Sequence, residues 1–149
     1  MTDRKRAYVI GVRITALASD AIRRTAELSA ERGEYTDDWR KECSDFIENT
    51  EDWMLGYSSK LIATVSDKDT GYAMLEVLRV ARDNDKVDYP GIVRTCFLGY
   101  NAVLVTYDKQ TADVILKGDN EGKNCLYYTL FHAAAGERYC CDVLLNNWR

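Results

Sequence analysis

The side chain best suited to acid–base chemistry near neutral pH occurs once in these 149 residues, as His132. Three cysteines, Cys125, Cys140 and Cys141, lie close to it in the sequence. A histidine can take a proton from a cysteine thiol, and the thiolate that results is a nucleophile. One alternative function is therefore an enzyme with Cys140 or Cys141 as nucleophile and His132 as base. A single histidine excludes every site that needs two.

The same four residues carry the ligand types that zinc prefers. Structural zinc sites usually take their cysteines from short CxxC-type spacings. Cys140 and Cys141 are adjacent, and they would point to opposite faces if their segment is a strand. We therefore predict no metal site and no cofactor, and we interpret the cysteines as small buried apolar groups. Their odd number, five, favours a reducing, cytoplasmic compartment.

A second pattern with chemical meaning is a run of acidic residues at helical spacing. The carboxylates recur every three or four positions and would share one helix face: Asp38, Glu42, Asp45, Glu48, and then Glu51 or Asp52. Like charges at this spacing repel each other. Such a face either points into open solvent or binds a basic partner. We predict that it docks a protein with a basic surface, such as a nucleic-acid-binding protein whose groove the acids would occupy in place of phosphates.

Residues 67–71 (DKDTG) form the string most like a motif, and they follow an apolar run. In that position the two aspartates loosely resemble the aspartyl-phosphate motif of haloacid-dehalogenase-type phosphatases. The capping chemistry of a helix N-terminus also accounts for the string, and we predict a helix start there. The sequence contains no GxxxxGK[ST] or GxGxxG phosphate loop and no GxSxG elbow.

Residues 7–48 loosely resemble a ribbon-helix-helix DNA-binding unit, on the strength of Val12-Arg13-Ile14-Thr15, Gly33, Thr36 and Trp39. The resemblance implies a DNA-binding regulator whose strand enters the major groove, and we keep this as an alternative. Among its groove-facing positions only Arg13 can read a base edge; the others are Ala7, Val9 and Gly11. Residues 1–24 carry a balance of +4, but the whole chain has a net charge of −4. Nucleic acid is therefore not the partner we expect first.

Tyrosine is abundant, with ten copies. A phenol combines a large apolar body with a polar tip, so tyrosines suit cores, contact surfaces and stacking platforms. A further alternative is a small-ligand or nucleotide binder with a pocket lined by tyrosines, for which the candidates are Tyr89, Tyr100, Tyr107, Tyr127 and Tyr128.

The elements that would position these residues follow from apolar periodicity and turn residues. We expect strands over 7–15, 60–66, 92–98, 102–107, 112–117 and 138–145. We expect helices from Ser19 or Asp20 to 32, from Thr36 to about 48, and after Ser66, with 118–124 as a loop. Residues 125–135 fit a helix capped by Asn124 and closed by Gly136 better than a strand. The order predicts an α+β fold with a mostly antiparallel sheet and three to four helices.

The length suits one domain, residues 1–149, with 1–56 as the only candidate for a separate lobe. No segment approaches the roughly 20 apolar residues of a membrane span. We predict a small, soluble, non-enzymatic binding protein that acts through its acidic helix face, with room for homo-oligomer formation. By analogy, this interpretation extends to an accessory inhibitor of the kind that phages and mobile elements encode.

Overall fold

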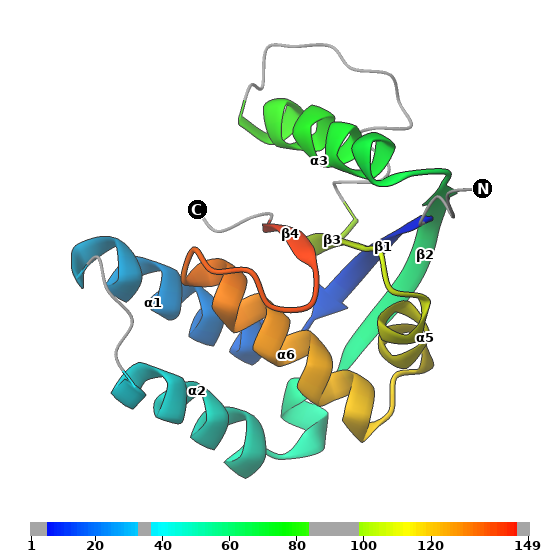
Figure 1. Cartoon of the computed structure of the whole chain (residues 1–149). Helices are drawn as coiled ribbons and strands as arrows, with labels where there is room; N and C mark the ends of the chain where they lie inside the picture. Colours follow the sequence, from blue (N-terminus) through cyan, green and yellow to red (C-terminus); the bar gives the residue numbers. More distant parts are fainter. Residues whose placement is uncertain (1–5, 33–36, 84–98, 146–149) are drawn as a thin grey trace.

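One antiparallel sheet organises the protein (Figure 1). The computed structural model describes residues 6–32, 37–83 and 99–145. Its strands lie in the order β2-β1-β3-β4 and are β1 (Ala7–Ile14), β2 (Tyr57–Val65), β3 (Ala102–Thr106) and β4 (Asp142–Leu145). The two central strands, β1 and β3, are apolar and largely buried on both faces, whereas β2 alternates between exposed and half-buried residues.

Helices cover both faces of this sheet. α3 (Lys68–Asp83) packs on one face, over a cluster that includes Val9, Val103 and Val105. The alternate side chains of the same strands, including Ile10 and Leu104, belong to the cluster on the other face. That second layer contains α1 (Ala16–Arg32), α2 (Asp37–Asn49), α5 (Lys109–Lys117), α6 (Asn120–Ala134) and the short 3-10 helix η1 (Asp52–Leu55).

Side-chain caps explain where several helices begin. The Asp67 carboxylate accepts a hydrogen bond of 2.8 Å from the Thr70 backbone N–H at the start of α3. Position 71 is a glycine because the helix lies close to the sheet here. A Cβ at this position would lie 3.0 Å from the Val105 side chain and 3.1 Å from that of Ala7. The 67–71 string is therefore the start of a helix that lies close against the sheet. α1 begins at Ala16, earlier than the predicted Ser19 or Asp20, because the Thr15 hydroxyl caps the Ala18 N–H.

Two predicted elements in the second half of the chain are wrong. Residues 112–117, expected as a strand, belong to α5, which Asp108 caps and Gly118 ends with a φ of 75°. Residues 118–124, expected as a loop, contain the first turn of α6, whose cap is Asp119 and not Asn124. The helical interpretation of 125–135 is confirmed, and Gly136 follows it with a φ of 79°.

The last strand is shorter than predicted, since β4 starts at residue 142 and residues 138–141 precede it without strand geometry. Between α2 and β2, residues 52–55 form η1. The predicted strand over 92–98 and the predicted helix start at Thr36 lie outside the described residues.

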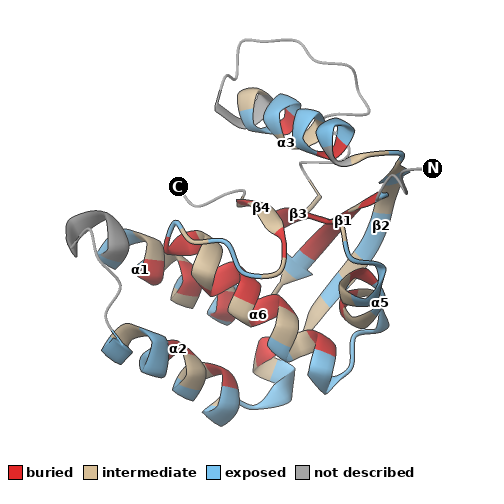
Figure 2. Cartoon of the chain, viewed as in Figure 1, coloured by how far each residue is buried: buried red, intermediate tan, exposed pale blue. Residues whose placement is uncertain are grey.

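The predicted α+β class with an antiparallel sheet in a single domain is confirmed, although the described residues hold five α-helices where we expected three to four. Side chains from residues 7–55 share one buried cluster with those of α5, α6 and β3 (Figure 2). Among the described residues, no helix is long and apolar enough to cross a membrane.

The position of β1 bears directly on the ribbon-helix-helix resemblance. β1 is hydrogen-bonded to β2 on one side and to β3 on the other. Ala7, Val9 and Gly11, which would face the DNA groove, are buried. Arg13 is exposed, but its guanidinium carbon lies over the Tyr100 ring, 5.4 Å from the centroid. A strand covered on both edges and both faces cannot enter a major groove, so this geometry contradicts the resemblance.

Candidate functional site

α2 lies at the margin of the helical layer and packs on α6 through one side only. Cys43 and Ile47 are its buried residues, and the Phe46 ring meets the Phe131 ring edge to face with 5.7 Å between centroids. The side of α2 that faces away from α6 is exposed (Figure 2). Trp39 and Phe46 lie on the same side of α2 as its two buried residues and are half-buried.

The predicted acidic residues of α2 are all exposed: Asp38, Glu42, Asp45 and Glu48. Within the described part of the chain, no cation forms an ion pair with any of them. The nearby Arg40 guanidinium contacts Asp37 at 3.4 Å and Glu137 at 3.2 Å instead. The acids lie on one side of a straight helix, so their negative charges reinforce each other over that surface.

The acidic stretch continues into η1, where an aromatic side chain joins it. Trp53 is 71% exposed, the most exposed of the large hydrophobic residues that the structure describes. Its indole N–H donates to the Glu51 carboxylate, which holds the ring beside the acids. Asp52 pairs with Lys123 at the start of α6, and this contact ties η1 to the body of the protein.

We call this set the acidic surface: Asp38, Glu42, Asp45, Glu48, Glu51, Asp52 and Trp53. The structure brings the predicted carboxylates together, but two of them have local partners, since Glu51 holds Trp53 and Asp52 holds Lys123. Sequence reasoning missed Trp53 as a member. The sequence did contain a signal for Trp53. The tryptophan directly follows two acidic residues in a short segment, which favours an exposed position for its side chain.

His132 lies at the C-terminal end of α6 and is engaged by neighbours other than thiols. Its Nδ1 is 2.9 Å from Glu137 Oε2. Its ring stacks on Tyr139 with 5.0 Å between centroids and meets Trp39 of α2 edge to face at 5.8 Å. Glu137 therefore bridges α6 and α2, because its other oxygen contacts Arg40. In this arrangement His132 acts as a packing and linking residue between the two helices.

Cys125 and Cys141 do not have the electrostatics of a nucleophile. Burial, followed by the neighbouring Cys140, raises the pKa of Cys125 to about 12. Burial also raises the pKa of Cys141 to about 12, with smaller contributions from Cys125 and Cys140. A catalytic cysteine needs the opposite shift, produced by a nearby cation. Among the described residues, no group of three or more His, Cys, Asp or Glu side chains could hold a metal ion.

The tyrosines proposed as a ligand platform are mostly packing residues. Tyr127 is fully buried and meets Tyr57 edge to face with 6.5 Å between centroids. The Tyr100 ring covers Gly11, where a Cβ would lie 2.7 Å from the ring. The Tyr128 hydroxyl bonds Ser44 of α2 at 2.8 Å, and Tyr89 lies outside the described residues.

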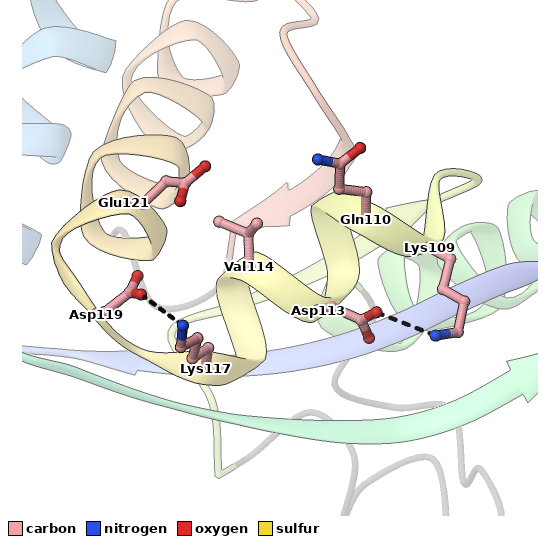
Figure 3. A pocket seen from close by; sticks show the side chains of 7 residues that line it. All are labelled: Lys109, Gln110, Asp113, Val114, Lys117, Asp119 and Glu121. Carbon is pink, nitrogen blue, oxygen red and sulfur yellow. Dashed lines mark hydrogen bonds and ion pairs between the residues drawn. The ribbon is translucent and has the colours of Figure 1, made fainter.

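A surface hollow of about 380 Å³ lies over α5 and the start of α6 (Figure 3). Its cations are already paired with carboxylates in the same hollow. Lys109 contacts Asp113 at 3.1 Å and Lys117 contacts Asp119 at 3.4 Å. The Asp119 carboxylate also caps α6, and this hydrogen bond from Gly122 lowers its pKa. Among the described residues, the hollow therefore offers no unpaired cation to a ligand.

No family model, curated protein or solved structure matches this chain. The function must therefore be inferred from the geometry of its own surfaces. Among the predicted sites, the acidic surface is the one whose groups are exposed and largely without partners in the described residues.

Proposed function

We propose that this chain is a binding protein that recognises a partner with a basic surface through the acidic surface of α2 and η1. The observation that carries the proposal is the combination of four exposed carboxylates on α2, which form no ion pair with the described residues, and an exposed tryptophan beside them. Neither feature contributes to the core, since α2 packs on α6 with its other side.

The energetics favour an external partner for this face. Each pair of like charges three or four residues apart destabilises a helix by about 0.2–0.5 kcal/mol. Lysine or arginine side chains from a partner would convert that repulsion into attraction, and they would also accelerate association through the long-range field. Trp53 supplies what a purely charged face lacks, because tryptophan is enriched among the residues that dominate binding energy. Its ring can also accept a cation at about 6 Å from the centroid.

The proposal is tested by comparative affinity capture from the native host. The baits are the wild-type chain, a variant that neutralises the face (D38N/E42Q/D45N/E48Q) and a matched control (E27Q/D69N/D113N/E121Q). The control removes the same number of charges from exposed positions on α1, α3, α5 and α6. Quantitative mass spectrometry of the retained proteins then compares the three baits.

We expect a basic protein to be retained by the wild-type chain and by the control but lost from the α2 variant. Its affinity should fall with rising salt, since exposed charges are screened over about 8–10 Å at physiological ionic strength. Equal retention by all three baits would remove the acidic surface from the proposal. If the partner binds nucleic acid, competition between the two ligands would support the inhibitor role.

A further inference from the structure

A second hollow, of about 510 Å³, lies on the opposite face of the sheet, between α3 and β4. α3 contributes Tyr72, Leu75 and Glu76 to its lining, and β4 contributes Val143 and Leu144. Tyr72 is 41% exposed, and its ring contacts the Tyr107 ring with 5.5 Å between centroids. This hollow shares no residue with the acidic surface, and it is lined by α3. α3 covers the face of the sheet opposite the other helices (Figure 1).

The lining residues of β4 show where this hollow lies relative to the strand. Leu144 belongs to the cluster under α3, whereas Val143 packs against the cluster on the other face of the sheet. Successive side chains of a strand point to opposite faces. Asp142 and Leu144 therefore share the α3 side of β4, with Val143 between them in the strand, and the hollow lies between this part of β4 and α3.

β4 is the outermost strand on its side of the sheet, and among the described strands it pairs only with β3. In an antiparallel strand, alternate residues direct both their N–H and their C=O groups to the outer edge. Backbone groups of this kind are a template for another strand. The edge of β2 differs, because an extra residue between Leu61 and Ala63 breaks its register with β1, and such a bulge works against strand addition.

The charged groups around the hollow are already paired. Arg79 donates to Glu76, with 3.1 Å between Nε and Oε2. Asp142 accepts from the Tyr107 hydroxyl at 3.1 Å and pairs with Arg138 at 3.2 Å. An occupant would therefore meet backbone groups along β4 and the apolar surface of Tyr72 and Leu75, and not an unbalanced charge.

We propose that this hollow binds an extended peptide segment of a partner protein, which adds to the outer edge of β4 as a further strand. Backbone hydrogen bonds to residues 142–144 fix the segment, and an apolar side chain of the segment packs between Tyr72 and Leu75 of α3. Three β4 residues extend over about 10 Å, so the paired part of the segment is three to four residues long. The site is independent of the acidic surface and of its proposed partner.

The test uses the full chain and a library of random twelve-residue peptides displayed on phage, followed by synthesis of the enriched peptides. Ala73→Arg places a long side chain in the hollow from an exposed helical position. Val77→Arg is the matched control, since Val77 is 42% exposed on the same helix but does not line the hollow. Thermal unfolding shows whether both variants stay folded.

We expect enriched peptides that carry an apolar residue and little charge. Their dissociation constants should rise at least tenfold for Ala73→Arg and change less than twofold for Val77→Arg and for D38N/E42Q/D45N/E48Q. Peptide binding should shift the backbone amide resonances of residues 142–144. The proposal is overturned if no peptide is enriched, if Ala73→Arg binds the peptides as tightly as the wild-type chain, or if the shifted resonances lie elsewhere.

Discussion

Trp53 is the residue on which the proposed binding function depends most. Because its side chain is 71% exposed, Trp53→Ala should leave the free energy of unfolding within about 0.5 kcal/mol of the wild-type value. The same change should weaken partner binding at least tenfold, as truncation of an interface tryptophan commonly does. Titration calorimetry with the captured partner measures the affinity, and urea unfolding measures the stability. Leu28→Ala, at another exposed apolar position, is the control and should change neither quantity.

The reactivity of single thiols tests the alternative that this chain is an enzyme with a Cys–His pair. Burial raises the pKa of Cys43 and of Cys141 to about 12. An ordinary thiol has a pKa near 8.5, so at pH 7 the thiolate fraction of these residues is far smaller than in the unfolded chain. Iodoacetamide should therefore alkylate them slowly in the folded protein, and the rate should rise with pH beyond pH 9. Site-resolved mass spectrometry makes the comparison with the unfolded chain.

One outcome of that labelling would favour the enzyme. A thiol among Cys125, Cys140 and Cys141 that reacts at pH 7 faster than in the unfolded chain, and that is slowed by His132→Ala, would show an activated pair. The structure gives His132 a different role, since its Nδ1 lies 2.9 Å from a carboxylate oxygen of Glu137.

At the scale of the element, the acidic face should cost α2 stability. Glu42 and Asp45, and then Asp45 and Glu48, stand three residues apart, and Glu48 lies next to the negative end of the helix dipole. The triple variant E42Q/D45N/E48Q should therefore raise the free energy of unfolding, by up to about 1 kcal/mol at low salt. Urea unfolding at low and high salt measures the gain, which should shrink as salt screens the repulsion. A loss of stability would show that these acids serve the fold.

Helices and strands were predicted correctly where apolar residues recur with one period over a long segment. They were predicted wrongly where N-cap residues determine that a helix forms. β1 and α2 could be predicted because their apolar residues repeat over eight or more positions. Residues 112–117 (ADVILK) form a short apolar run with two β-branched side chains, and this strand-like composition hid a helix whose buried positions, Ala112 and Ile115, are three apart. The deciding features were the caps Asp108 and Asp119, which a sequence also offers as ordinary turn residues.

Gly122 illustrates a further limit on what sequence can show. Within a run rich in polar residues and glycine it indicated a loop, yet it lies in the first turn of α6. A Cβ at this position would stand 2.4 Å from the Val114 carbonyl oxygen and 2.6 Å from the Tyr57 hydroxyl. The glycine is there because α6 starts close against α5 and β2, and that contact depends on tertiary packing.

For the molecule as a whole, the buried thiols and phenols predict a pH dependence of stability. Burial raises the pKa of Cys125 and of Cys141 to about 12, and it raises the pKa of Tyr57 to about 12 as well. Each group keeps its proton in the folded state at a pH where the unfolded chain loses it. Their contribution is therefore complete below about pH 8.5 and is lost as the pH rises toward 12. Urea midpoints should fall steadily between pH 8 and pH 11, and a constant midpoint would contradict the burial of these groups.

The candidate site was also predictable only in part. Helical spacing placed four carboxylates on one exposed face of α2, and the structure has them there. Trp53 and the Lys123–Asp52 pair depend on how η1 meets α6, a contact between residues 71 positions apart. The hollow beside β4 required knowledge of which strand ends the sheet, and strand order is not encoded in local periodicity.

The most direct measurement of the central claim is photo-crosslinking in the native host from position 53. Trp53 is replaced by p-benzoylphenylalanine, which keeps an aromatic group on the acidic surface, and Glu121 on α6 receives the same replacement as the control. We predict one major adduct from position 53, with a basic protein, and its disappearance when D38N/E42Q/D45N/E48Q is added. The absence of an adduct from position 53, or an equal adduct from position 121, would contradict a partner-binding role for the acidic surface.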